Sequence, residues 1–381
     1  MRSFLDYLLF TCFFFATSLV TVAIENGDFL SLQKRLIGIF EENKDAIVQV
    51  KAAYQRINES GDPDIEVRMG TGFFISREGH ILTNAVLASD ADRIWAIHLG
   101  IEYPAKSFGD DKSNNLSLLQ LSNLPEKFNF LHLTDSPELP SIGTMVVRLS
   151  TPFELEPTPY LGLIAGHESR FGERIFPCTY IRTSIPRAVG EDGAPLLDLN
   201  GNLVGVQIGI LRELQASYFL PTRAALRLRD DLLFSGKVTY GWIGFDVEEQ
   251  NTIKNGTQIV LSRVYSDTPA ESVGMFPGDV LVNIGDYDIK RVSDVRNAIF
   301  YTREGQFVSV KVKRDNEEID YNMRVAVKQI EDLVEDIELT QELSKGDLKQ
   351  TLSPYKQATI KDEEQEEPGK PPASDYVPED E

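Results

Sequence analysis

Short apolar runs separated by turn residues set the strongest limit on how this chain can fold. Between residues 46 and 221 the sequence contains AIVQVKA, MGTGFFIS, HILTNA, RIWAIHL, LSLLQL, TMVVRLS, LGLIAG, YIRTS, PLLDL, LVGVQIGI and ASYFLP. Each run has the length of one strand. Many short strands at this spacing are typical of an all-β barrel or sandwich rather than of alternating βαβ units. We therefore predict that the first part of the chain is mainly β.

Helical spacing occurs at only a few places. The stretch SLQKRLIGIFEENKDAIVQV begins as a helix and continues into a strand, and TRAALRLRDDLLFSG predicts a domain-ending helix that closes at Gly236. A second, α+β unit follows from about Val238 to Lys328, with strands around IGFDV, TQIVLSRV, DVLVNIG and FVSVKVKR. Its helix, in SDVRNAIFYT, has Ser293 or Asp294 as the expected cap.

The N-terminus has the pattern of an export signal. Arg2 precedes an apolar run from Tyr7 to Val22, and Thr21 and Ala23 have the spacing of a signal-peptidase site. We expect cleavage after Ala23 and a periplasmic or other extracytoplasmic location. An uncleaved membrane anchor stays open, because the run is only slightly shorter than the roughly 20 residues that span a bilayer.

Charge and cysteine content exclude several classes of function. The net charge is -21, and residues 331–381 contain 16 acidic and 5 basic residues. We expect this tail to be disordered, where it either engages a basic partner or solvates the chain end. An acidic chain is repelled by nucleic acids and anionic membranes. Only Cys178 remains after cleavage, so no disulfide forms, and since no Cys/His cluster has metal-site spacing we expect neither metal nor cofactor.

Three motifs and the end of the first domain resemble the HtrA (Deg) family of exported serine proteases. The motifs are GTGFFISREGHILTNAVLASDADRI, NNLSLLQL and RTSIPRAVGEDGAPLLDLNGNLVGVQIG, and SYFLPTRAALRLRDDLLFSGKVTYGWIGFDV is similar to the family's passage into a PDZ domain. The resemblance covers residues 35–328. It implies a chymotrypsin-like double β-barrel over 24–236 and a PDZ domain over 237–330, between the expected signal peptide over 1–23 and the acidic tail over 331–381.

At the three positions where these motifs carry the catalytic side chains of the family, this chain has other residues. The histidine position is Val86, the aspartate position is Asn115 and the serine position is Asp192. Hydrolysis by this route needs a hydroxyl nucleophile, a base and a carboxylate that orients the base. Loss of the serine or histidine alone costs on the order of 10⁶ in turnover. We therefore predict that the protein is not an enzyme, and that the Asp192 carboxylate accepts the N–H groups of residues 190–192 and plugs the pocket.

Other residues offer no obvious replacement. An acid–base pair of Asp192 with Glu191 is less probable than a solvated acidic turn. His80 lies too far along an extended chain from Val86 to take its place. The remaining histidines, His98, His132 and His167, and the serine Ser184 are outside any recognisable catalytic motif.

The second unit keeps the features of a peptide-binding PDZ domain. GWIGFDV resembles the carboxylate-binding loop, and SDTPAESVGMFPGDVLVNIGDYDI resembles the segment that follows in such domains. An extended peptide pairs there with a strand edge, and backbone N–H groups hold its carboxylate. The expected peptide-binding residues are Trp242, Ile243, Gly244, Phe245, Val295 and Ile299. The alternative is that several of these are plain core residues.

Three functions remain open from the sequence. The first is an HtrA-like pseudoprotease that binds peptides, protein C-termini or unfolded polypeptides, with a regulatory or chaperone-like role in envelope protein quality control. The resemblance also implies a homotrimer or an assembly with active relatives. The second is an active endopeptidase that uses unrecognised residues, and the third is an envelope scaffold.

Overall fold

The computed structural model describes residues 29–57, 61–171, 174–186, 189–211, 216–252 and 256–327. The predicted signal peptide (residues 1–23) and the predicted tail (residues 331–381) lie outside these ranges. A helix over residues 29–43 comes first, followed by the 3-10 helix η1 (Lys44–Ala46) and the first strand. This confirms the helix-to-strand passage expected for this stretch. Within the described residues, no helix has the length and apolar character needed to cross a membrane.

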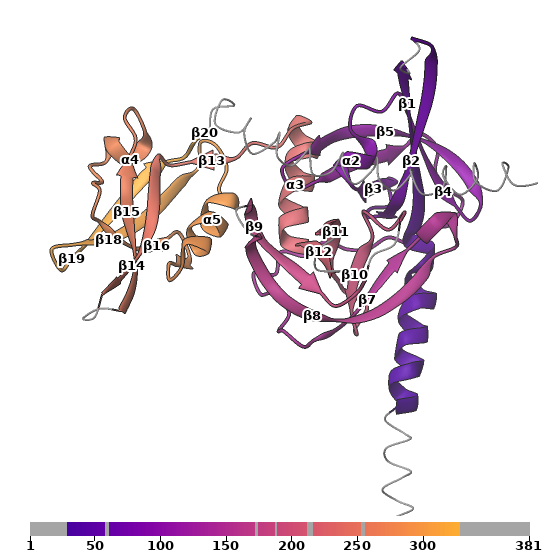
Figure 1. Ribbon diagram of the computed structural model, residues 1–381, viewed down its shortest axis with the longest axis horizontal. Helices are drawn as coiled ribbons and strands as arrows, with labels where there is room; N and C mark the ends of the chain where they lie inside the picture. Colours follow the sequence, from indigo (N-terminus) through magenta and orange to yellow (C-terminus); the bar gives the residue numbers. More distant parts are fainter. Residues whose placement is uncertain are drawn as a thin grey trace, which may run out of the picture. The chain divides into compact units, whose positions relative to one another are not determined.

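The first barrel is closed by six antiparallel strands in the order β1-β2-β3-β6-β5-β4 (Figure 1). The strands are β1 (Ile47–Ile57), β2 (Pro63–Phe74), β3 (His80–Thr83), β4 (Arg93–His98), β5 (Ile101–Asp111) and β6 (Leu116–Leu121), with the one-turn helix α2 (Ala85–Ala88) after β3. Because successive side chains of a strand point to opposite faces, Val48, Val50 and Tyr54 of β1 share one buried cluster. Beyond the barrel, β1 and β2 continue as a paired hairpin.

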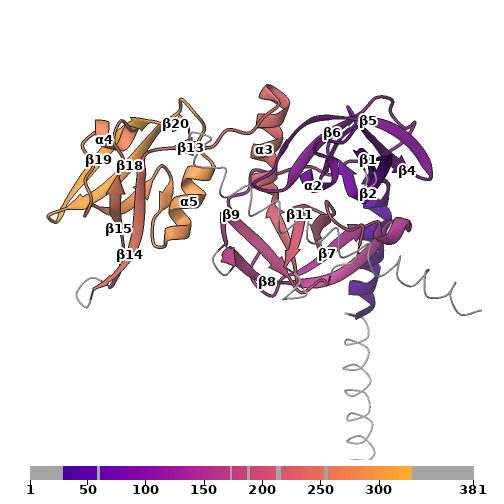
Figure 2. The same ribbon diagram turned by 45° about the horizontal axis from the view of Figure 1, so that its top comes forward.

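The second barrel is also closed, in the order β10-β11-β12-β9-β8-β7 (Figure 1 and Figure 2). Its elements are β7 (Met145–Ser150), η2 (Pro152–Glu154), β8 (Thr158–Phe171), β9 (Arg174–Thr183), β10 (Pro195–Asp198), β11 (Leu203–Leu211) and β12 (Ala216–Pro221). Helix α3 (Thr222–Ser235) follows and contacts strands of both barrels. It ends at Gly236, whose φ of 70° is the left-handed conformation that glycine adopts without strain, as predicted.

The second unit is an antiparallel sheet in the order β14-β15-β16-β18-β19, with β17 paired to β16. Its elements are β13 (Gly241–Trp242), β14 (Phe245–Thr252), β15 (Gly256–Val264), α4 (Pro269–Ser272), β16 (Val280–Ile284), β17 (Tyr287–Asp288), α5 (Val292–Phe300), β18 (Phe307–Arg314), β19 (Glu317–Arg324) and β20 (Ala326–Val327). A separate apolar cluster forms its core. The predicted fold, a double β-barrel followed by a PDZ domain, is confirmed.

Besides elements of two to four residues, two strands and one helix start differ from expectation. β5 and β19 were not expected, because both are mostly exposed and lack a continuous apolar run. Helix α5 begins one residue before Ser293, with Arg291 at its N-cap, so neither Ser293 nor Asp294 is the cap. Asp294 instead reaches back from the first turn, where its carboxylate accepts the backbone N–H groups of Lys290 and Arg291.

Candidate active-site cleft and peptide groove

The residue at the predicted aspartate position joins the two barrels. Asn115 lies between β5 and β6 in the left-handed region (φ 52°), which asparagine tolerates better than most residues. Its Oδ1 accepts the backbone N–H of Val86 at 2.9 Å, and its Nδ2 donates to the carbonyl of Ile208 on β11 at 2.5 Å. A carboxylate cannot make the second bond, because it has no donor. The amide is therefore used fully as a structural bridge.

The residue at the predicted histidine position is the second residue of the short helix α2. Val86 is half-buried, and both its backbone N–H and its carbonyl form hydrogen bonds. Its carbonyl accepts Nη1 of Arg68 at 3.0 Å, and that guanidinium also lies 4.3 Å from the centre of the Tyr54 ring and 2.8 Å from a carboxylate oxygen of Glu66. The valine side chain itself can neither take up nor return a proton.

The loop at the predicted serine position is held by backbone contacts to both barrels. The N–H of Thr71 on β2 donates to the carbonyl of Asp192 at 2.8 Å, and the Thr71 hydroxyl donates to the carbonyl of Gly190. The N–H of Gly193 donates to the carbonyl of Gln207 on β11 at 3.0 Å. Gly193 has φ 88°, and a Cβ there would lie 2.2 Å from the Thr71 carbonyl oxygen, so only glycine fits.

A buried ion pair lies directly behind this loop. Nη2 of Arg148, on β7, is 2.6 Å from Oε1 of Glu191, and both side chains are 0% exposed. Arg148 also donates to Oε1 of Gln207 at 3.3 Å, and Gln207 Nε2 lies 3.5 Å from Oδ1 of Asp192. Burial lowers the pKa of Arg148 from its ordinary value, and the Glu191 carboxylate opposes that shift.

This pair corrects one expectation from the sequence. Glu191 is not part of a solvated acidic turn, because it is fully buried against Arg148 and also accepts the Ser150 hydroxyl at 3.2 Å. The expected bonds from the Asp192 carboxylate to the N–H groups of residues 190–192 stay a prediction. Arg148 and Gln207 were missed altogether. The signal for Arg148 was one arginine in the middle of the apolar run TMVVRLS, since a charge in a buried strand requires a partner.

One serine and one histidine are in hydrogen-bond contact, but at the other end of β3. Ser76 Oγ lies 2.8 Å from Nδ1 of His80, the first residue of β3, whereas Thr83 at the end of that strand contacts the Gly193 loop. Ser76 Oγ also accepts the N–H of Glu78 at 3.2 Å, so its position is that of a turn cap. The contact therefore lies outside the cleft.

The other histidines are also placed away from Asp192. His98 is 2% exposed, and its Nε2 lies 3.0 Å from the Asp45 carbonyl. His167 Nε2 is 2.9 Å from the carbonyl of Pro140, and the His132 ring packs on Phe130. None of the four histidines takes the place of a base at Val86.

His80 makes folding stability depend on pH. Burial lowers its pKa in the folded protein, so below the unfolded value of about 6.5 the unfolded chain binds a proton that the folded chain resists. We expect the melting temperature to fall as pH decreases from about 7.5 to about 5.5, and to fall less in His80→Gln. Ser76→Ala retains the half-buried imidazole and is expected to retain the fall. An equal fall in His80→Gln would assign the effect to other groups.

The PDZ unit offers an open strand edge beside a helix. β14 is the outer strand of its sheet, and α5 lies against it (Figure 1). In the loop before β14, the carbonyls of Ile243 and Gly244 accept the N–H groups of Ala270 and Tyr265, both at 2.9 Å. Gly244 has φ 93°, and a Cβ there would lie 2.2 Å from the Cβ of Thr268. This combination of strand edge, helix and tight glycine loop suits addition of an extended peptide.

The six expected peptide-binding residues divide into two groups. Ile243, Phe245 and Val295 are at most 7% exposed and belong to the core cluster, as the alternative interpretation holds. Trp242 and Ile299 are half-buried and so remain accessible at the surface. Gly244 shapes the loop. Their role in peptide binding stays a prediction.

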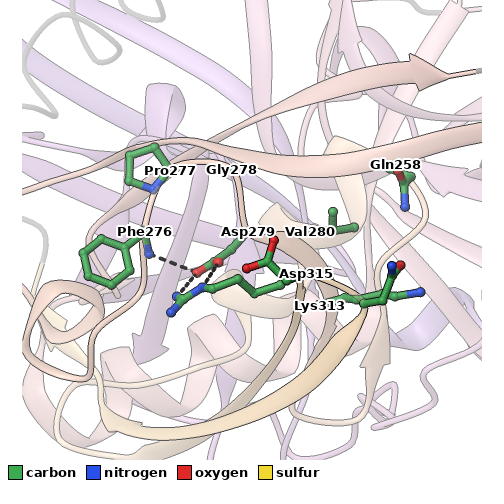
Figure 3. Close-up of a pocket in the computed structure, with 10 residues that line it drawn as sticks. Gln258, Phe276, Pro277, Gly278, Asp279, Val280, Lys313 and Asp315 are labelled. Atoms are coloured by element: carbon green, nitrogen blue, oxygen red, sulfur yellow. Dashed lines mark hydrogen bonds and ion pairs between the residues drawn. The ribbon is translucent and has the colours of Figure 1, made fainter.

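A separate hollow in the PDZ unit has a different chemistry. It has a volume of about 580 Å³ and is lined by Gln258, Phe276, Pro277, Gly278, Asp279, Val280, Lys313, Arg314, Asp315 and Asn316 (Figure 3). Its arginine is already engaged, because Arg314 makes two bonds to the Asp279 carboxylate, at 2.6 and 2.7 Å. In the part of the chain that the structure describes, no group of three or more metal-ligating side chains forms a cation site.

Comparison with known proteins agrees with these two units. Residues 70–206 match the trypsin-like peptidase domain, and residues 241–325 match the PDZ domain. A probable periplasmic serine endoprotease DegP-like from Hahella chejuensis is 29% identical over 269 residues, covering 67% of this chain and 56% of that protein. The corresponding protein of Chlamydia trachomatis is 29% identical over 276 residues, with 69% and 55% covered. The chain thus spans about half the length of the curated relatives it matches.

Solved structures share the fold. The HtrA-type protease AlgW with a decapeptide has a TM-score of 0.62 and 23% identity, and the match covers 77% of this chain and 99% of that one. The serine endoprotease from Yersinia pestis has a TM-score of 0.53 at the same identity, with 77% and 98% covered. At this level of identity the likeness concerns the fold alone.

Proposed function

Because the chain belongs to the HtrA (Deg) family, with a trypsin-like peptidase domain followed by a PDZ domain, we propose that it is a pseudoprotease that binds polypeptides without cleaving them. The trypsin-like domain would span residues 24–236 and the PDZ domain residues 237–330. The names of the periplasmic relatives support an exported protein with a role in the envelope. Assembly as a homotrimer or with active relatives is part of the same proposal.

The observation that carries this proposal is the use made of Asn115. A working triad needs a carboxylate there to orient an imidazole, and the imidazole to activate a hydroxyl. In this chain an amide occupies the position and bonds a valine backbone and a strand carbonyl. Asp192 has no hydroxyl, and a carboxylate opposes the negative charge that develops in acyl transfer. Asn115 thus lacks the charge that would orient a base, and Asp192 lacks the hydroxyl that would attack the substrate.

Polypeptide binding is proposed for the PDZ domain. Its outer strand β14, the glycine loop before it and the neighbouring helix α5 are the elements that such domains use for C-terminal peptides. One relative of known structure is described with a decapeptide. Protein C-termini and unfolded chains with exposed ends are therefore the proposed partners.

An active endopeptidase is the competing function, and the names of the relatives favour it. The test is hydrolysis of unfolded casein together with labelling by a fluorophosphonate probe, which reacts with activated serine hydroxyls. We expect the wild-type protein to show neither casein hydrolysis nor probe labelling above the level of an Asp192→Ala variant. Labelling that disappears in Ser76→Ala would identify the contact with His80 as a nucleophilic site and overturn the proposal. Cleavage that disappears in Asp192→Ala would overturn it in favour of the endopeptidase.

A further inference from the structure

The space beside residue 192 is filled by side chains from three parts of the second barrel. Arg148 comes from β7, Glu191 from the loop and Gln207 from β11. Arg148 also donates to the carbonyl of Pro186 at 2.9 Å, and its guanidinium lies 4.4 Å from the centre of the Tyr160 ring. Arg148 therefore bridges the loop, the segment before it and two strands.

This cluster is tight as well as buried. The side chains of Arg148, Glu191 and Gln207 are all 0% exposed. Gln207 lies between the guanidinium and the Asp192 carboxylate and contacts both. An arginine paired in this way cannot turn out to solvent without leaving a buried carboxylate uncompensated. The volume behind residue 192 is thus closed by an arrangement that has no low-cost alternative.

Proteases with this fold hold the substrate side chain that precedes the cleaved bond in a pocket next to the nucleophile. We propose that Arg148 and Glu191 form a second block on catalysis, which closes that pocket independently of the missing triad. The inference rests on the proposed function and extends it, because it states that two separate changes have removed proteolysis. The first change removes the groups that transfer the proton, and the second fills the pocket for the substrate side chain.

The two blocks predict different results for different variants. Restoring Val86→His, Asn115→Asp and Asp192→Ser together supplies the chemistry but leaves the pocket closed. Adding Arg148→Ala and Glu191→Asn to that triple variant removes the guanidinium and the carboxylate at once, so that no unpaired buried charge remains. The matched control adds Arg182→Ala and Glu168→Gln instead, because that pair has the same chemistry at 2.8 Å but is about 30% exposed on the same barrel.

The full-length proteins are compared by casein hydrolysis and by the rate of fluorophosphonate labelling. We expect the triple variant to cleave casein no faster than the background rate and the five-site variant to cleave it at least about tenfold faster than that background, since one filled or vacated pocket changes specificity by that amount. The control variant should behave as the triple variant does. Thermal melting and binding of a C-terminal peptide to the PDZ domain show that each variant is folded.

Each outcome decides between the two claims. Casein cleavage by the triple variant at the rate of the five-site variant overturns the second block and leaves the pseudoprotease proposal intact. A folded five-site variant with no gain in either rate also overturns it. If that variant does not fold, Arg148→Ser with Glu191→Gln in the triple background replaces it, and the same two results apply. Cleavage by the wild-type protein instead overturns the proposed function.

Discussion

Replacing Arg148 by methionine lowers the free energy of unfolding of the barrels by roughly 3–5 kcal/mol, the largest stability effect expected of any single change near the cleft. The substitution keeps the length and apolar body of the side chain but leaves the Glu191 carboxylate without its counter-charge. Both side chains are 0% exposed, so water cannot compensate for the loss. Unfolding in chemical denaturant is monitored by the fluorescence of Trp95, which lies on β4 of the first barrel. All proteins in this comparison carry Trp242→Phe, so that Trp95 is the one remaining tryptophan of the sequence.

Two further variants separate this explanation from a general intolerance of substitution. Arg148→Met combined with Glu191→Leu removes both charges, and such replacements of a buried pair are often neutral or stabilising, so we expect most of the lost stability to return. Arg182→Met breaks the pair with Glu168, which is about 30% exposed, and should cost only about 0–1 kcal/mol. If Arg148→Met is no more destabilising than Arg182→Met, the buried pair does not stabilise the loop.

The barrels could be predicted because their strands carry a local signal. Each strand interior alternates faces, as in β1, where the residues of one face enter the barrel core. The strand β5 escaped prediction because its burial is low along most of its length and Pro104 interrupts it. β19 is the outer strand of its sheet and is similarly polar. A strand that faces solvent has no need of the apolar run by which sequence patterns are recognised.

The cleft was predictable only in part, for a related reason. The positions of Val86, Asn115 and Asp192 follow from motifs that are contiguous in sequence. The contact between Arg148 and Glu191 does not follow from any contiguous motif, because the two residues are 43 positions apart. They meet only when β7 pairs with β10 and closes the second barrel. A sequence shows that a buried charge needs a partner, but closure of the barrel selects which one.

The two units also differ in what has changed. In the cleft, we propose that charged and amide side chains occupy positions that a substrate and a proton shuttle would require. In the PDZ unit, the tight glycine at 244, the outer strand and the helix beside it are the elements of the proposed peptide site. The proposed loss of hydrolysis concerns the cleft residues and the proposed peptide capture concerns the PDZ unit, so each can be tested without the other.

Replacing Ile299 by glutamate weakens binding of a C-terminal peptide by at least about tenfold, the second large effect expected. Ile299 is half-buried on α5, where the helix lies against β14, so the new carboxylate is placed beside the strand edge proposed for the peptide and must be partly desolvated. It also repels the terminal carboxylate of the peptide. Fluorescence anisotropy with a labelled hexapeptide that ends in valine measures the affinity, and the same peptide with an amidated end tests the need for the carboxylate.

Gln258→Glu is the matched control for this change. It adds the same single charge to the same domain, but in the hollow of Figure 3 rather than beside β14. We expect the control to bind the peptide as the wild type does, and both variants to keep the melting transition of the domain. If Gln258→Glu loses affinity and Ile299→Glu retains it, the peptide occupies the polar hollow. If the amidated peptide binds as tightly as the free acid, the Gly244 loop does not hold a carboxylate, and recognition depends on the strand edge and the apolar side chains alone.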